Sequence, residues 1–96
     1  MPSFQPGQSL TVHTASAVLA AGLQAIAAGQ TAFDLSAVAE LDSAAVATLL
    51  AWQRAALARG KPLAFIRVPA NLCSLMRLYG VAELLLPAEK ADFRHH

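Results

Sequence analysis

The chain has little charge, few aromatic residues and almost no cysteine, and each shortage narrows the range of functions. Only 14% of its 96 residues are charged, 6% are aromatic, and Cys73 is the single cysteine. One cysteine cannot form an intrachain disulfide, which fits a reducing compartment and predicts a cytoplasmic protein. The 7 basic and 6 acidic residues give a net charge of +1 without a basic stripe, so nucleic acid is not an expected partner.

Long hydrophobic runs are missing too. The longest nearly uncharged helical run, residues 43–53, is well short of the roughly 20 residues that a helix needs to cross a bilayer. The first residues, MPSFQPGQ, have neither the basic nor the apolar part of a signal peptide. We therefore expect no direct membrane insertion, and any association with a membrane would come through a partner protein.

Hydrophobic residues, many of them alanine, make up 56% of the chain. A chain of this size buries about two-thirds of its unfolded surface, which is enough for one sheet and a few helices. We expect a single domain over residues 1–96, with its core at about 9–87 and a loose tail at 88–96. An alanine-rich exposed face would also favour a homodimer of the isolated domain.

The hydrophobic pattern predicts strands over residues 3–5, 9–13, 32–35 and 62–68, the first two forming a hairpin around Pro6-Gly7. It predicts helices from Thr14 to Gly29, from Ser43 to Arg59 and from Pro69 to Gly80. Residues 81–86 read as either a short strand or a helical turn. The expected fold is α/β, with a mixed four- to five-stranded sheet, an opening hairpin and three to four helices, its crossovers right-handed.

The stretch from Phe33 to Trp52 carries the functional signal. A short strand ends at Asp34, a loop follows, and Asp42-Ser43 opens a helix. Backbone N–H groups point outward at a helix N-terminus, where the helix dipole also favours negative charge. Such a junction can hold a phosphate, cap the helix, or present a docking edge.

Catalysis is the weakest interpretation of these residues. Asp34 and Asp42 could pair as carboxylates, and a Ser43–His13–Asp34 triad can be drawn, but no nucleophile-elbow pattern surrounds the serine. There is no glycine-rich phosphate loop, and no further carboxylate or histidine stands at ligand spacing. We expect no enzymatic activity, no cofactor and no metal.

Several segments together resemble the STAS domain. They are the strand ending Asp-Leu-Ser, the later Asp-Ser at a helix rich in small residues, the helix end Ala-Arg-Gly-Lys, and the segments Leu-Met-Arg-Leu-Tyr-Gly-Val and Glu-Leu-Leu-Leu-Pro. The last two look most like the STAS subunit (MlaB-like) of Mla-type phospholipid ABC transporters, and the resemblance covers residues 9–87. The chain departs from the family at Ala45, where a glycine is usual.

The resemblance implies two alternative functions. In the first, the chain is a non-enzymatic subunit that binds the ATPase of a phospholipid-transporting ABC complex, meets the membrane permease through that complex, and contributes to outer-membrane lipid asymmetry. In the second, it is an anti-sigma factor antagonist that a partner kinase switches by phosphorylating Ser43. The added phosphate would place about −1.5 to −2 charges at a packed interface.

The helix after Ser43 suggests where a partner would bind. At 100° per residue, one arc should face the sheet and comprises Val46, Leu49, Leu50 and Leu57. The opposite arc comprises Ala45, Thr48, Trp52, Ala55 and Arg59, and its small residues around one aromatic are typical of an interface. The alternative is that Trp52 packs sideways onto the neighbouring helix.

The predicted partner-binding surface therefore comprises Asp42, Ser43, Ala44, Thr48, Trp52 and Arg77. Four of them, Ser43, Ala44, Thr48 and Trp52, form what we call the predicted ridge. On this hypothesis, Thr48→Arg abolishes partner binding and leaves the melting temperature nearly unchanged. Cys73 and Tyr79 on the third helix would extend the same surface; the alternative for Cys73 is that of a small buried hydrophobic residue.

Overall fold

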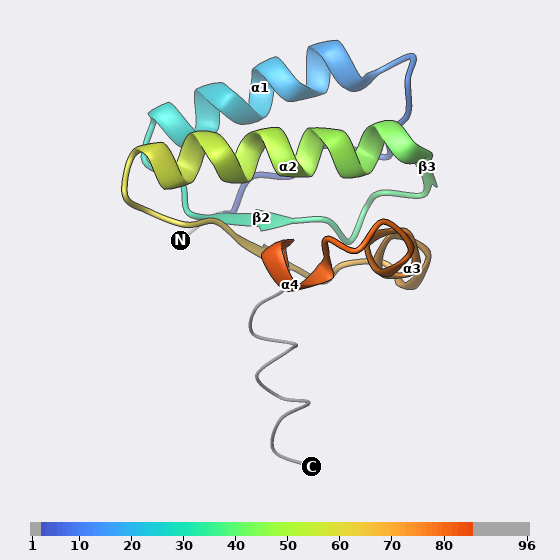
Figure 1. The fold of residues 1–96 in the computed structure, drawn as a ribbon. Coiled ribbons are helices and arrows are strands. Elements are labelled where there is room, and N and C mark those ends of the chain that lie inside the picture. The colour runs from blue at the N-terminus through green and yellow to red at the C-terminus, as the bar shows by residue number, and fades with distance from the viewer. Residues whose placement is uncertain (1–2, 86–96) are drawn as a thin grey trace.

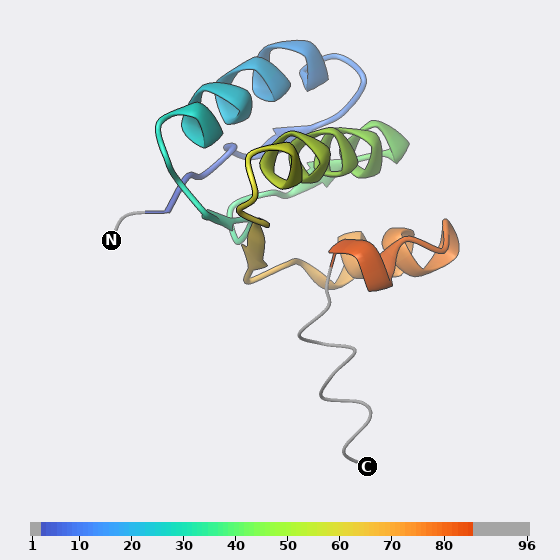
Figure 2. The same cartoon turned by 60° about the vertical axis from the view of Figure 1, so that its left-hand side comes forward.

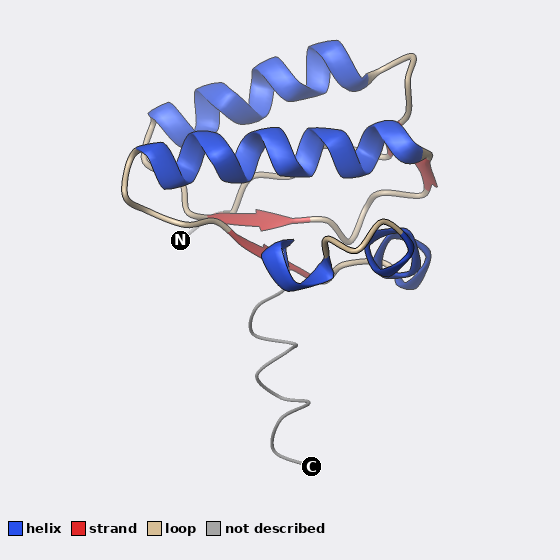
Figure 3. Ribbon diagram, viewed as in Figure 1, coloured by secondary structure: helices blue, strands red, loops and turns tan. Residues whose placement is uncertain are grey.

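The computed structural model describes residues 3–85, in which short strands alternate with helices (Figures 1 and 3). The strands are β1 (Ser9–Leu10), β2 (Ala32–Asp34), β3 (Glu40–Leu41) and β4 (Ala64–Ile66). The helices are α1 (Ala15–Ala27), α2 (Ser43–Ala58), α3 (Ala70–Leu78) and α4 (Ala82–Leu85). Within the described residues, no helix is both long and apolar enough to cross a membrane.

All strand pairing between residues 3 and 85 is parallel. β1 pairs with β3, β2 pairs with β4, and Phe4 forms an isolated parallel bridge with Phe33. The expected α/β class is confirmed, and the four helices between residues 3 and 85 agree with the three to four expected. The single mixed sheet of four to five strands is wrong, because the described strands form two separate two-stranded sheets.

The predicted opening hairpin is also wrong, because its two arms bind different strands. The backbone of Phe4 bonds to Ala32 and Asp34, whereas the Gln8 carbonyl accepts from Ala39 and Glu40. The intervening segment, in which Gly7 has a φ of 100°, carries the chain from one sheet to the other instead of reversing it. The predicted strand over residues 9–13 ends early, at Leu10, since a turn follows it.

The two long helices run side by side and in the same direction over one side of β2, and α3 and α4 pack elsewhere against α2 (Figures 1 and 2). This arrangement encloses one hydrophobic core between the helices and the strands. Its completely buried large side chains include Leu10, Phe33, Leu35, Leu49, Trp52, Leu72 and Met76. The position of α2, in contact with both α1 and the α3–α4 pair, decides which of its faces remains accessible.

The predicted helix boundaries agree closely with the structure. α2 begins at Ser43 as predicted, α3 begins directly after Pro69, and the closing element is the helical α4. Tyr79, which the sequence placed on the third helix, directly follows the end of α3 at Leu78, and its side chain is half exposed. The predicted tail, residues 88–96, lies outside the described residues.

Candidate functional site

Asp42 fixes the start of α2. Its Oδ1 accepts a hydrogen bond from the Ala44 N–H at 2.8 Å, which is the bond of a helix N-cap. Its Oδ2 accepts a second bond from the Val12 N–H at 3.1 Å, in the turn after β1. Both carboxylate oxygens are therefore engaged by backbone donors, and Asp42 joins the entry of α2 to the turn that precedes α1.

Ser43 is the exposed residue of this junction. It occupies the first position of α2, directly after the Asp42 cap, and its side chain faces solvent. Ala44 beside it is half-buried; its N–H bonds to Asp42, and its carbonyl accepts from the Thr48 hydroxyl. The predicted role of Ser43 as a contact or phosphoacceptor therefore meets the minimum requirement of access to solvent.

The predicted ridge is wrong at Thr48 and Trp52. Thr48 is only 4% exposed, and its hydroxyl donates to the Ala44 carbonyl one turn earlier at 2.8 Å. Trp52 is completely buried, and its indole Nε1–H donates to the Leu19 carbonyl of α1 at 3.0 Å. Neither side chain is accessible to a partner, so the alternative that Trp52 packs onto the neighbouring helix is confirmed.

Close packing with α1 explains why this arc of α2 is small. Gly22 of α1 faces the Trp52 ring so closely that an added Cβ would overlap the indole. The other side of the indole meets Phe33, with ring centroids 5.0 Å apart and the planes inclined at 73°. Ala45 of this arc and Ala56 beside it are both buried, and their small side chains let α2 lie close to its neighbours.

A different face of α2 borders an open groove. Ser43, Val46, Ala47 and Leu50 of α2 line one wall, and Tyr79 and Val81, which follow α3, line the other. Ala47 is exposed, Leu50 is half-buried, and Tyr79 is 52% exposed. We call these six residues the α2–Tyr79 groove, and Ser43 stands at its edge.

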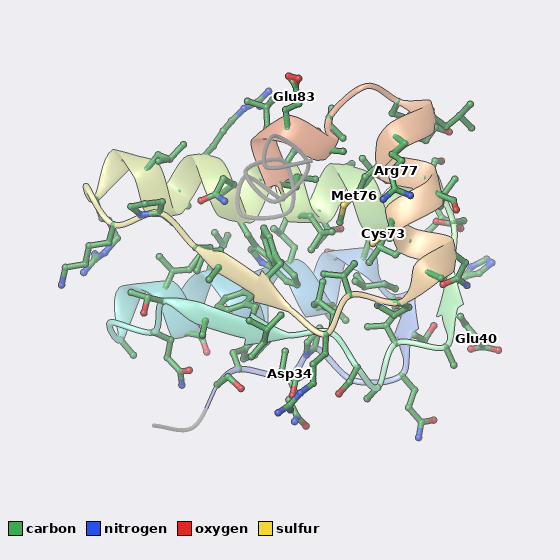
Figure 4. The ribbon with its side chains drawn as sticks, turned by 90° about the horizontal axis from the view of Figure 1, so that it is seen from below. Asp34, Glu40, Cys73, Met76, Arg77 and Glu83 are labelled. Atoms are coloured by element: carbon green, nitrogen blue, oxygen red, sulfur yellow. The ribbon has the colours of Figure 1, made fainter. Side chains whose placement is uncertain are left out.

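The apolar surface extends beyond the groove. Leu57 on α2, Leu78 at the end of α3 and Leu84 on α4 are all more than half exposed. Arg77, predicted to bind a partner, is exposed on α3, whereas Cys73 is half-buried among the core side chains (Figure 4). Cys73 therefore has the ordinary role of a small hydrophobic residue and does not extend the accessible surface.

Asp34 lies well away from Arg77, at the carboxyl end of β2 (Figure 4). Its carboxylate is only 2% exposed and accepts bonds from the Ser36 N–H at 2.9 Å, Arg67 Nη1 at 2.8 Å and Gln5 Nε2 at 3.4 Å. Hydrogen bonding from Ser36 is the main cause that lowers the pKa of Asp34; Arg67 adds to it and burial opposes it. Asp34 is thus an ionised structural carboxylate.

The Arg67 partner of Asp34 adopts an unusual backbone conformation. It follows β4 with a φ of 54°, which is the left-handed region that non-glycine residues rarely occupy. Its guanidinium forms an ion pair with Asp34 and so links the ends of β2 and β4, which are paired. The Arg67 side chain nevertheless stays 71% exposed. We interpret this pair as a tie between the ends of β2 and β4, at the point where the chain turns toward α3.

The structure does not assemble the triad that the sequence allowed. Among residues 3–85, no hydrogen bond links Ser43, His13 and Asp34, and the Asp34 carboxylate is already held by Arg67 and Ser36. No group of three or more His, Cys, Asp or Glu residues within these bounds could hold a metal ion. The two aspartates, Asp34 and Asp42, serve separate structural purposes and do not form an acid–base pair.

Sequence reasoning missed Ala47 as a candidate contact and placed Leu57 on the wrong face, whereas Leu50 does pack partly against the core. The missing signal was Gly22: a glycine inside an alanine-rich helix marks the close approach of a neighbour, and the one tryptophan was available to fill that space. Pairing Gly22 with Trp52 would have predicted that Trp52 faces the core and that Leu57 faces solvent.

Two comparisons with known proteins bear on this geometry. No curated protein matches the chain. A family model described as "Mlab, STAS domain" matches residues 8–87, which contain β1 to α4 and all six residues of the α2–Tyr79 groove. The match covers most of the 96 residues, and the chain therefore belongs to the MlaB-type STAS domain family.

Proposed function

We propose that this protein is a non-enzymatic, cytoplasmic accessory subunit that binds the ATPase of a phospholipid-transporting ABC complex of the Mla type. Through that complex it is peripheral to the inner membrane and next to the membrane permease. It supports the assembly or activity of the transporter and so contributes to outer-membrane lipid asymmetry. The membership in the MlaB-type STAS family supports this class of function.

The α2–Tyr79 groove is the observation that carries the proposal. At the start of α2, the groove brings together the exposed hydroxyl of Ser43, the small residue Ala47 and the apolar side chain of Leu50. Groups of exposed apolar residues beside a polar rim are typical of protein-binding surfaces. The proposed partner-binding residues are Ser43, Ala47, Leu50, Tyr79 and Val81, with Arg77 at the periphery.

Co-purification tests the proposal directly. The tagged chain, expressed in its own organism, should recover an ABC ATPase together with the permease, and the purified ATPase should bind it in solution. Ala47→Asp places a charge at an exposed position of the groove and should abolish binding, whereas Ala20→Asp makes the same change at an exposed position on α1 and should not. Equal binding by both variants would place the interface elsewhere.

Ser43 supports a second candidate, the anti-sigma factor antagonist. Its hydroxyl is exposed at the N-terminus of a helix of 16 residues, where a phosphate would be stabilised by the helix dipole. This candidate requires a serine kinase that co-purifies with the chain and a phosphopeptide that contains Ser43. Recovery of the ABC ATPase, with Ser43 unmodified, would reject it.

A further inference from the structure

The exposed side of α2 forms a continuous stripe that is longer than the groove. Its residues are three or four positions apart and share one side of the helix. They are Ser43, Ala47, Leu50, Arg54 and Leu57. From Ser43 to Leu57 the stripe extends for about 21 Å at 1.5 Å per residue, which is the length of a helix of three to four turns.

The walls of the groove favour a helical partner over an extended one. One wall is α2, whose backbone groups bond within the helix, and the other is the segment from Tyr79 to Val81, whose N–H groups bond back to carbonyls of α3. An extended segment laid between these walls would find no ladder of donors and acceptors. A helix satisfies its own backbone and needs only side-chain contacts. Ala47, which is small and exposed near the middle of the groove, lets such a helix approach closely.

The free edge of β4 is a poor alternative site for an extended partner. Both backbone groups of Leu63, which precedes β4, already bond to the Gln53 side chain. The Gln53 amide accepts from the Leu63 N–H at 2.8 Å and donates to the Leu63 carbonyl at 3.1 Å. At the other end, the left-handed Arg67 turns the chain away from the strand direction. Short strands that are closed in this way resist strand addition.

Charge identifies the chemistry of the partner helix. Arg54 is the only ionisable residue of α2, and it is exposed in the middle of the apolar stripe. Within residues 3–85, Arg54 forms no ion pair. A cation between Leu50 and Leu57 is complementary to a carboxylate flanked by apolar side chains.

We propose that the stripe binds an amphipathic helix of the ATPase that carries an acidic residue opposite Arg54. Its apolar residues fill the α2–Tyr79 groove. If it runs along α2, its carboxylate lies about 10 Å from the side chain that covers Ala47, because Ala47 and Arg54 are seven residues apart. This inference rests on the proposed function and specifies which element of the partner is recognised.

A charge-reversal series with the purified ATPase as the probe tests the inference. Arg54→Glu should raise the dissociation constant about tenfold or more, and Lys61→Glu, an exposed cation outside the stripe, should leave it within about twofold. A photo-crosslinking residue at Ala47 should attach to one helix of the ATPase, and the same residue at Ala20 should not. Reversing the acidic residue of that helix to Lys should restore the affinity of Arg54→Glu.

The outcomes separate the inference from the proposed function. If the unaltered chain does not bind the ATPase, both fail. If it binds and Ala47→Asp abolishes binding, but Arg54→Glu has no effect, the function stands and the acidic helix is rejected. Attachment of Ala47 to a loop or a strand, or to a second copy of this chain, also rejects it.

Discussion

The two faces of α2 differ in solvent exposure, and their amino-acid composition suggests the opposite of the difference observed. One face contains Ala45, Thr48 and Trp52 and is buried, with Trp52 packed on α1, whereas the opposite face contains Ala47 and Leu57 and is exposed. By residue type alone, the first looks like a smooth docking surface and the second like part of a core. The difference teaches that small residues on an alanine-rich helix mark a close neighbour, which here belongs to the same chain.

The largest expected effect is that of Thr48→Arg. A guanidinium placed at a side chain that is 4% exposed must either lose its hydration or push the surrounding structure apart. We expect a loss of stability on the order of 4 kcal/mol or more, which would unfold much of the protein. Circular dichroism during urea unfolding measures it, and Thr48→Val, which keeps the shape, is the control. A melting temperature close to that of the unaltered chain would revive the predicted ridge.

Gly22→Ala should have the next largest effect. The added methyl would overlap the Trp52 indole, so the helices must separate or the ring must move, and overpacking of this kind costs about 1–3 kcal/mol. Alanine gains up to about 1 kcal/mol of helix propensity, which only partly offsets this cost. Trp52→Phe in the same chain should restore part of the loss, as urea unfolding of both single variants and the double variant will show. Strictly additive losses would mean that Gly22 and Trp52 are not coupled.

The sequence predicted the local elements better than their partners. Asp42 as a cap, Ser43 as the first residue of α2 and Pro69 before α3 follow from short-range rules that depend on a few neighbouring residues. The hairpin failed because strand pairing is a long-range choice: Phe4 pairs with Phe33, and Ser9 with Glu40, across an intervening helix. Nothing in residues 3–13 alone distinguishes these partners.

The candidate site was predicted in part. Asp42 and Ser43 could be found, because a strand-to-helix junction is visible in the sequence and determines where the first turn of α2 points. The rest of the surface could not, because the orientation of an alanine-rich helix is weakly specified by its hydrophobic pattern. Leu57 is 56% exposed and Ala45 is buried, the reverse of what their hydrophobicity suggests.

A smaller effect concerns the Asp34–Arg67 tie, far from α2's exposed face. Since the folded pKa of Asp34 lies below its unfolded value of about 3.9, ionised Asp34 stabilises the fold above that pH, and this contribution is lost as the pH falls through the folded pKa. Asp34→Asn should therefore be less stable than the unaltered chain at pH 7 and approach it in acid. Urea unfolding at several pH values tests this prediction.

A second variant identifies the cause of that shift. Arg67→Gly removes the guanidinium and also relieves the left-handed backbone, but it leaves the Ser36 bond in place. Because hydrogen bonding from Ser36 is the larger cause of the lowered pKa, Arg67→Gly should retain more of the pH dependence than Asp34→Asn does. A pH profile as flat as that of Asp34→Asn would make Arg67 the dominant cause.

The smallest effect on stability should come from Ala47→Arg, the same new side chain as in Thr48→Arg but one residue earlier. Ala47 is exposed, and arginine is nearly as good a helix former as alanine, so we expect a change within about 0.5 kcal/mol. Binding of the ATPase should nevertheless be lost, because the long side chain fills the groove between Leu50 and Tyr79. The adjacent pair separates folding from docking: one arginine unfolds the protein, and the other leaves it folded without its partner. If Ala47→Arg binds normally, the exposed face of α2 is not the interface.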